Sequence, residues 1–505
     1  MYKVPLALFN RDEVLGLGDY RIYEHPILSF KRGRRITFFF EDQVVEAYEG
    51  ESILAALYAI GIRIFSYTPD GRGRGPFCMI GKCSSCLSLV NGLPNTRICI
   101  EPVSEGVRVY RQQGLPGIPS TQSVDSIETE HVETDALVVG AGPAGLQAAL
   151  TMAEQGMEVI LVNDHYKLGG QLVKQTHRFF GDRRFYGGLR GFAIANELSE
   201  KVYENRRITV YTQALAYGFF RDGLVGIALS SEGEKKNLVV KPSTVVIATG
   251  AAEKLLAFEG NDLPGVMGAG AAQTLMNEYG VKPGDKAIVV GSGNVGLIVS
   301  YQLLQAGTKV LCIAEIMPRV GGWFVHAAKI RRLGVPILTQ HTIVGVRGED
   351  RVEEAAIARV DEKLRILPGT EKVYDVDLVL LAIGLQPNYT LVSQAGAAMK
   401  YVPELGGLVP VRTLYQETSV PGLYIAGDVS GIEEATTAFI EGRIAGLSAA
   451  IKLGFAGRSE ARERDQLIDY LWKEYRMSPV VARAREGKLK VTVTEEEMER
   501  IRREL

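Results

Sequence analysis

Cysteine is scarce in this chain and unevenly placed. The 505 residues contain five cysteines, too few for a disulfide scaffold, and four of them lie within one stretch of 22 residues. No run of about 18 uncharged apolar residues occurs, so the sequence predicts no transmembrane segment. The first residues also lack the basic segment and long apolar stretch of a signal peptide. We therefore expect a soluble, cytoplasmic protein whose clustered cysteines hold a metal.

An excess of charge of either sign is also missing. The 57 basic and 59 acidic residues leave a net charge of −2, which argues against a nucleic-acid surface or a polybasic membrane anchor. A 46% hydrophobic and 23% charged composition is that of a folded globular protein. The length predicts roughly three domains. The 56 glycines exceed the usual share of about 7%, which is common where tight turns and phosphate loops are frequent.

The sequence also shows no recognisable acid–base centre. The six histidines are scattered, and no nucleophile and base stand at a suggestive spacing. We assign no catalytic residue, and we expect binding sites to carry the function.

One pattern occurs twice in the second part of the chain. An apolar strand runs into G-x-G-x-x-G, then a helix, a second apolar strand and an acid, and in both copies the first glycine lies 24 positions before the acid. The first copy contains Gly140, Gly142, Pro143, Ala144, Gly145 and Asp164. The second copy contains Gly291, Gly293, Asn294, Gly296 and Glu315. A repeat of this length is much stronger support for nucleotide binding than one glycine motif.

Each glycine of such a loop has a physical task. The first makes a tight turn, the second lets a pyrophosphate approach the backbone, and the third lets the helix pack close to the strand. The helix N-terminus then offers free N–H groups to the phosphates. Asp164 and Glu315 suit an unphosphorylated ribose, although the nearby Arg319 keeps a 2′-phosphate open. A purely structural glycine turn is the alternative for either loop.

Three buried strand ends complete the pattern: Val245–Gly250, Leu380–Gly384 and Gly422–Asp428. With the loops, they resemble the two-dinucleotide-domain flavoproteins of the glutathione reductase and thioredoxin reductase type. The resemblance implies an α/β fold of two Rossmann-like domains, one inserted in the other. It assigns the first loop with Asp164, Gly170, Gln171, Thr249, Gly250, Gly427 and Asp428 to an FAD-type site. It assigns the second loop with Glu315 to an NAD-type site.

The chain departs from that superfamily in one respect. Its disulfide reductases carry a redox cysteine pair near the flavin, but Gly169–Leu172 continues here without cysteine. Cys312 lies on an expected strand of the second domain and is predicted to be a small buried hydrophobe. A dithiol relay is therefore excluded.

The cysteine cluster offers another route for electrons. Cys78, Cys83, Cys86 and Cys99 follow the C-x4-C-x2-C spacing of plant-type ferredoxins, whose four thiolates hold a [2Fe–2S] cluster. The strands and helix that precede them follow the order of a β-grasp ferredoxin. The fourth cysteine comes sooner than in plant ferredoxins, so structural zinc remains an alternative.

The combination of a ferredoxin-like module with a flavoprotein resembles a narrower family. The chain from about residue 25 is similar to the α subunit of dye-linked L-proline dehydrogenases, the opine oxidase A subunit, sarcosine oxidase α and a hydrogen cyanide synthase subunit. The residues that carry this likeness are Arg97–Cys99, Gly250–Glu253 and Leu263–Met267. It implies an electron-transfer role beside an FAD-containing, amine-oxidising β subunit in a hetero-oligomer, with FMN between the subunits. One loop can hold NAD or an adenine nucleotide instead of FAD.

These motifs predict the domain boundaries. We expect an N-terminal extension (1–30), a [2Fe–2S] ferredoxin-like domain (31–112), a linker (113–131), an FAD-type domain (132–275 and 385–453), an NAD-type domain (276–384) and a C-terminal helical tail (454–505). The aromatic stripe Asp469–Tyr475 of the tail could dock a partner or pack on its own domain. The alternative functions are a self-sufficient NAD(P)H-dependent flavin/iron–sulfur oxidoreductase and a nucleotide-binding structural subunit.

Overall fold

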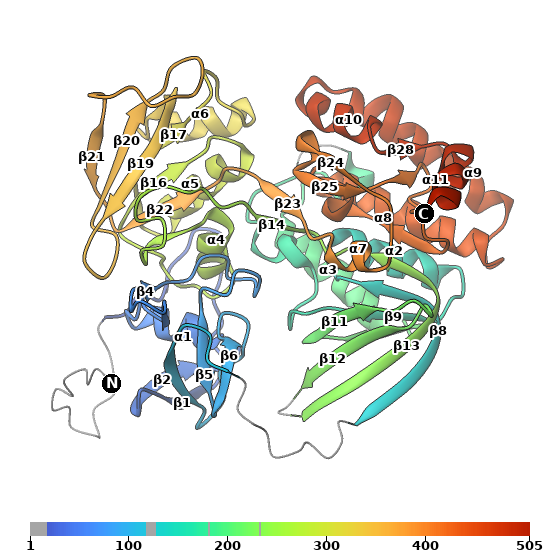
Figure 1. Cartoon of the computed structure of the whole chain (residues 1–505), viewed down its shortest axis with the longest axis horizontal. Helices are drawn as coiled ribbons and strands as arrows, with labels where there is room; N and C mark the ends of the chain where they lie inside the picture. The colour runs from blue at the N-terminus through green and yellow to red at the C-terminus, as the bar shows by residue number, and fades with distance from the viewer. Residues whose placement is uncertain (1–17, 118–127, 180–181, 232–233) are drawn as a thin grey trace. The chain divides into compact units, whose positions relative to one another are not determined.

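The computed structural model describes residues 18–117, 128–179, 182–231 and 234–505. The described chain folds into two compact units (Figure 1). Unit 1 takes the N-terminal part through residue 121 and residues 253–384, and unit 2 takes residues 122–252 and 385–505. The expected N-terminal extension lies largely outside the described residues, as does the central part of the expected linker.

The cysteine-rich module of unit 1 is built around one helix and a mixed sheet. Helix α1 (Ile53–Ala59) begins where the Ser52 hydroxyl accepts a hydrogen bond from the Ala55 N–H at 3.2 Å, and all its residues are buried. The strands are β1 (Arg35–Phe40), β2 (Gln43–Tyr48), β3 (Ser66–Tyr67), β4 (Gly73–Arg74), β5 (Leu87–Val90), β6 (Leu93–Arg97) and β7 (Arg108–Gln113). The path β2-β1-β7-β3-β4, with β1 and β7 parallel, agrees with the predicted β-grasp order.

The second part of unit 1 is a Rossmann-like domain. Its five-stranded parallel sheet has the order β15-β22-β16-β17-β18, and a separate antiparallel meander joins β19, β20 and β21. The strands are β15 (Val266–Gly268), β16 (Lys286–Val290), β17 (Lys309–Glu315), β18 (Ile337–Thr339), β19 (His341–Arg347), β20 (Glu354–Arg359), β21 (Lys372–Asp375) and β22 (Leu378–Leu381). The helices are α4 (Ala269–Asn277), α5 (Asn294–Gln305) and α6 (Phe324–Arg332).

The cysteine-rich module and this Rossmann-like domain share one hydrophobic core. Residues of β1 and α1 pack in the same buried cluster as residues of α4 and α5. The Tyr58 hydroxyl donates to the Pro283 carbonyl, and the Gly268 N–H donates to the Phe77 carbonyl at 2.9 Å. The cysteine loop is therefore attached to the domain of the second glycine loop through buried, directional contacts.

Unit 2 repeats the Rossmann-like plan. Strands β10, β9, β8, β13 and β27 form the parallel part of its sheet, and β13, β12 and β11 form an antiparallel meander. The strands are β8 (Thr129–Val139), β9 (Val159–Val162), β10 (Ile208–Tyr211), β11 (Ala214–Phe219), β12 (Val225–Ser231), β13 (Glu234–Ile247) and β27 (Leu423–Ile425). The continuous apolar runs of β8 and β9 fit a sheet that is covered on both faces.

Helices and short strands complete unit 2. The helices are α2 (Pro143–Glu154), α3 (Gly191–Glu204), α7 (Thr390–Gln394), α8 (Ala435–Lys452), α9 (Arg458–Asp469), α10 (Ala482–Leu489) and α11 (Glu495–Glu504). The short strands are β23 (Leu385–Pro387), β24 (Met399–Val402), β25 (Gly407–Pro410), β26 (Arg412–Thr413) and β28 (Thr492–Val493), and β14 (Ala251–Glu253) crosses the boundary between the units. Helix α8 lies against α2 because Gly442 permits close approach: a Cβ there would meet the Ala144 carbonyl oxygen at 2.2 Å.

One segment groups differently from the boundaries expected above. Residues 253–275, which we assigned to the FAD-type domain, belong to unit 1, because β15 pairs with β22 and α4 packs beside α5. The tail after residue 453 belongs to unit 2, and its Leu471 is completely buried. Among the described helices, none is both long and apolar enough to cross a membrane.

Candidate functional site: two nucleotide loops and a four-cysteine loop

The first glycine loop joins β8 to α2 at the carboxyl end of the sheet. Gly140 has φ +104°, and a Cβ there would meet the Ala248 carbonyl oxygen at 2.4 Å. A Cβ at Gly145 would meet the Gly140 carbonyl oxygen at 1.8 Å, whereas one at Gly142 would have no protein atom within 4 Å. The outer glycines are thus required by the fold itself, and the middle glycine opens onto space that a pyrophosphate can use.

Other predicted residues gather around this loop in unit 2. A Cβ at Gly170 would lie 2.8 Å from the Gly142 Cα, and one at Gly427 would lie 3.0 Å from the Ala144 Cβ. Gln171 follows Gly170 in the short helix η1 (Gly170–Lys174) and is exposed. Helix α2 has Pro143 in its first turn, where the missing proline N–H costs nothing. The fold therefore brings the loop, the Gly-Gly turn and the Gly427–Asp428 segment together.

Thr249 and Gly250 lie at the next strand end. The Thr249 hydroxyl donates to the Asn388 carbonyl at 2.8 Å, and Gly250 has φ +68° with open space at its Cβ position. These two residues lie between β13 and β14, at the carboxyl edge of the sheet.

Asp428 occupies the short helix η4 (Gly427–Ser430) after β27. It lies deep in the unit, keeps part of its side chain exposed, and accepts a hydrogen bond from the Glu433 N–H at 3.3 Å. Burial, above all, raises the pKa of Asp428 to about 6. A largely buried carboxyl that keeps part of its surface accessible can accept hydrogen bonds from the hydroxyl groups of a ligand.

This pKa predicts how Asp428→Asn changes stability. A carboxyl whose pKa is raised on folding favours the folded state only while it is protonated. Its contribution to stability is therefore fully present below pH 3.8, the unfolded pKa, and is lost as the pH rises through the folded pKa of about 6. We expect Asp428→Asn to stabilise the FAD-free protein by roughly 3 kcal/mol at pH 8 and by about half of that at pH 5. Urea denaturation at the two pH values measures the difference; an equal effect at both would contradict it.

The second glycine loop repeats this geometry in unit 1. Gly291 has φ +105° and would place a Cβ 2.4 Å from the Ala382 carbonyl oxygen, while one at Gly296 would meet the Gly291 carbonyl oxygen at 2.1 Å. Gly293 again has open space. Asn294 begins α5, and its side-chain oxygen accepts a hydrogen bond from the Trp323 N–H at 2.8 Å.

The acids that follow the two loops do not occupy equivalent places. Glu315 is buried, and its carboxylate accepts hydrogen bonds from the Ser292 N–H at 2.8 Å and the Met317 N–H at 2.9 Å. In the first copy the residue that accepts from the loop is Asn163, which takes the Ala141 N–H at 3.2 Å. Asp164 is the next residue and is exposed.

A strand irregularity explains the difference. Against β16, Val310 pairs with Ala287 but Cys312 pairs with Ile288, so Leu311 is one extra residue. Counting 24 positions from the first glycine therefore reaches Glu315 in one copy and the residue after Asn163 in the other. Sequence reasoning missed Asn163, and only its place directly before Asp164 could have indicated it. The ribose role of Asp164 stays a prediction.

The four cysteines lie close together in the module of unit 1. Cys78, Cys86 and Cys99 are buried, and Cys83 is partly exposed. The Cys78 sulfur accepts hydrogen bonds from the Lys82 N–H at 3.4 Å and the Ile80 N–H at 3.5 Å. Hydrogen bonds from the Cys83 and Cys99 thiols, together with these N–H groups, hold the pKa of Cys78 far below its usual range.

The arrangement of the sulfurs fits a binuclear cluster. Cys83 contacts Cys78, and Cys99 contacts both Cys78 and Cys86. Each iron of a [2Fe–2S] cluster takes two of four thiolates, and these contacts bring all four cysteines into one group. Gly81 has φ +71°, which favours glycine in the loop. The remaining cysteine, Cys312, is completely buried, as predicted.

Two nucleotide-type loops and a four-cysteine loop define an iron–sulfur flavoprotein. Residues 134–442 match the pyridine nucleotide-disulphide oxidoreductase family, and residues 33–114 match the 2Fe-2S iron-sulfur cluster binding domain. The chain belongs to the pyridine nucleotide-disulphide oxidoreductase family. The predicted fold class, oxidoreductase class, [2Fe–2S] cluster and FAD are thereby confirmed.

Individual relatives place the chain more closely. It is 29% identical over 63% of its length to the opine oxidase A subunit of Agrobacterium tumefaciens and 26% identical over 86% to the sarcosine oxidase alpha subunit of a Corynebacterium species. These alignments span 66% and 45% of the two relatives, so the chain covers less than two thirds of their length.

The solved structures agree. L-proline dehydrogenase from P. horikoshii superposes with a TM-score of 0.66 and 25% identity, covering 88% of this chain and 79% of that one. Thioredoxin reductase from T. acidophilum shares the fold, with a TM-score of 0.51 and 20% identity over 64% of this chain and 99% of that one. The family resemblance inferred from the sequence is confirmed.

Proposed function

We propose that this chain is the electron-transfer subunit of a hetero-oligomeric amino-acid dehydrogenase that acts on proline-like secondary amines. An FAD-containing β subunit oxidises the amine, and this chain passes the electrons to an external acceptor. The complex works in the cytoplasm, with FMN at the subunit boundary. FAD binds at the first loop, where Asp164 and Asp428 hold its hydroxyl groups and Gly142 admits the pyrophosphate. Cys78, Cys83, Cys86 and Cys99 hold the cluster, which supplies one-electron transfer.

The observation that carries this proposal is the pairing of a flavin-type site without cysteine with a four-cysteine loop elsewhere in the same chain. Gly169 and Gly170 are followed by Gln171 and the buried Leu172, so the described turn beside the first loop offers no thiol. Cys312 is completely buried, and burial raises its pKa to about 11, which keeps it protonated. Electrons that reach a flavin here therefore have the cysteine cluster as their exit.

The partner and the substrate class rest on the relatives. Their names are those of subunits of opine and sarcosine oxidases, and a proline dehydrogenase shares the fold over most of the chain. Opines, sarcosine and proline are all secondary amines, so a secondary amine is the substrate class that they have in common.

The proposal predicts that the chain alone does not oxidise proline. We expect dye reduction by the isolated chain to be at least ~10³-fold slower than by the complex, because its sequence offers no acid–base centre to supply catalysis. The assay compares the chain expressed alone and with its β subunit, using proline, sarcosine and an artificial dye. Dye reduction at complex-like rates by the isolated chain would refute the division of labour.

A second candidate is an NAD(P)H-dependent oxidoreductase. It is favoured by the second loop, whose Gly293 opens onto free space and whose buried Glu315 suits a 2′-hydroxyl. Addition of NADH to the isolated chain under anaerobic conditions separates the two: rapid bleaching of flavin absorbance supports this candidate, and bleaching that needs an amine together with the β subunit supports the first.

A further inference from the structure

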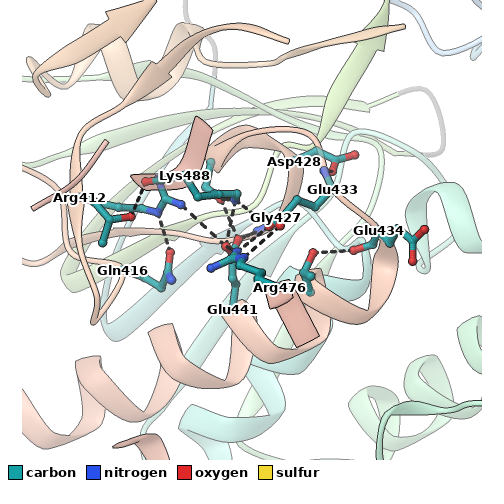
Figure 2. A network of polar contacts seen from close by, with 12 residues as sticks. Arg412, Gln416, Gly427, Asp428, Glu433, Glu434, Glu441, Arg476 and Lys488 are labelled. Atoms are coloured by element: carbon teal, nitrogen blue, oxygen red, sulfur yellow. Dashed lines mark hydrogen bonds and ion pairs between the residues drawn. The ribbon is translucent and has the colours of Figure 1, made fainter. Parts of the chain in front are cut away.

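The C-terminal tail carries cations that end inside unit 2. Arg476 and Lys488 follow α9 in the chain, yet their side chains are 1% and 0% exposed. Figure 2 shows both reaching toward Glu441 of α8, with Arg412 on the other side. Buried cations are rare in proteins unless they are paired, so these side chains depend on the acidic partners around them.

Glu441 joins the tail to the Gly427–Ser430 turn. One carboxylate oxygen accepts hydrogen bonds from the Arg476 guanidinium at 2.7 Å and the Lys488 ammonium at 3.0 Å. The other accepts from the Gly427 N–H at 3.0 Å and the Ser430 hydroxyl at 2.7 Å. Tail cations and turn therefore share one side chain.

Two further contacts strengthen this connection. Lys488 also donates to the Ser430 hydroxyl at 2.9 Å. Glu433, just after the turn, pairs with Arg476 through both of its oxygens and with Lys488 at 3.2 Å. On one side of Asp428 the two tail residues therefore act on Gly427 through Glu441, and on the other side they contact Glu433 directly.

The charges of Arg476 and Lys488 keep the buried Glu441 carboxylate ionised. Burial alone would raise the pKa of Glu441, but Lys488 and Arg476 outweigh it and hold that pKa well below the usual range. Without these two cations Glu441 would keep only the ion pair with Arg412 at 3.9 Å, which does not replace two hydrogen-bonded cations, so the buried carboxylate would take up a proton or move toward water. Either change weakens the acceptor that orients the Gly427 N–H and the Ser430 hydroxyl.

We propose that Arg476 and Lys488 are positioning residues for the flavin site: acting through Glu441, they hold the Gly427–Ser430 turn so that Asp428 faces the ligand. The proposal rests on the function proposed above, in which FAD occupies the first loop. It adds the tail, which carries no nucleotide motif, to the machinery of that site.

The test measures FAD affinity in variants that remove one tail charge at similar volume. We expect Arg476→Met and Lys488→Met to raise the dissociation constant of FAD at least ~10-fold. The matched control is Lys473→Met, whose side chain is 72% exposed and pairs with Asp469 on the surface. Ser430→Ala, which removes one shared hydroxyl but leaves both tail cations paired with Glu441, is expected to weaken FAD binding severalfold, and Arg476→Lys should keep part of the affinity that Arg476→Met loses.

If Arg476 and Lys488 only stabilised the fold, their variants would melt at lower temperature but would bind FAD as tightly as the wild type. FAD titrations are therefore run well below the melting temperature of each variant, with the cluster absorbance as a check that unit 1 is intact. In Lys488→Met the pH dependence of FAD binding should also move to higher pH. Burial, Glu433 and Glu441 raise the pKa of Asp428, and the charge of Lys488 lowers it, so loss of that charge raises this pKa further. A lower melting temperature with unchanged FAD affinity in all the variants would overturn the proposal.

The same titration separates this inference from the proposed function. A wild-type chain that binds no FAD would refute the cofactor assignment and, with it, the positioning role. A wild-type chain that binds FAD, with variants that bind it equally well, would refute the positioning role alone.

Discussion

Replacement of Gly142 by valine is expected to remove FAD from the protein while leaving it folded. A Cβ at this position meets no protein atom within 4 Å, and the backbone φ of −77° is open to any residue. The added methyl groups would instead occupy the space that a pyrophosphate needs. We expect at least a ~100-fold loss of affinity, about 2.7 kcal/mol, measured as FAD per chain after purification and by titration.

The second loop offers the matched control. Gly293→Val makes the same change in the same local geometry, but in unit 1, so it should leave FAD content unchanged and affect only a nucleotide at the second loop. Substitution of Gly140 or Gly145 would not serve, because a Cβ at either would collide with backbone. Full FAD content in a folded Gly142→Val protein would show that FAD is not bound at this loop.

Replacement of Cys83 by serine is expected to abolish the [2Fe–2S] cluster. Cys83 is the partly exposed member of the four and contacts Cys78. Loss of one of the four thiolates leaves one iron with a single protein sulfur. Iron should fall from about two per chain to nearly none, and the paramagnetic signal of the reduced cluster should disappear. Bound FAD, which we propose to lie in unit 2, should remain.

Cys312→Ser is the control for that experiment. This cysteine is completely buried on β17, and Tyr374 provides a hydrogen-bond partner for a hydroxyl there. We expect its cluster content to equal that of the wild type. Zinc without acid-labile sulfide in anaerobically prepared wild-type protein would contradict the cluster assignment.

The glycine loops were predictable because their chemistry is local. Gly145 is required by its contact with the Gly140 carbonyl, and Gly140 by the tight turn at φ +104°, so their spacing survives as a sequence motif, whereas the contact of Gly140 with the Ala248 carbonyl comes from a distant strand end. The acids were harder to assign, because the extra residue Leu311 in β17 changes the count without leaving any mark in the sequence. In the first copy Asn163 accepts the hydrogen bond from the loop N–H that Glu315 accepts in the second, and the predicted ribose role of Asp164 stays a prediction.

The aromatic stripe of the tail shows the same limit. Its residues indicated either a docking surface or packing on the chain's own domain, and the pattern fits both. In the structure Tyr470 stacks on Phe185 with ring centroids 5.4 Å apart, and the Tyr475 hydroxyl donates to Glu434. The stripe therefore packs within unit 2.

The sequence by itself determined the fold class, the two nucleotide loops and the four-cysteine loop, because each depends on residues close together in the chain. Only the tertiary structure decided that the cysteine module shares its core with the second nucleotide domain. It also decided that Lys488 hydrogen-bonds Ser430 of the Gly427–Ser430 turn and that Arg476 hydrogen-bonds Glu441, which accepts from the same turn. Such contacts follow from which buried charges need partners, and charge pairing across distant segments has no period or spacing that a sequence can display.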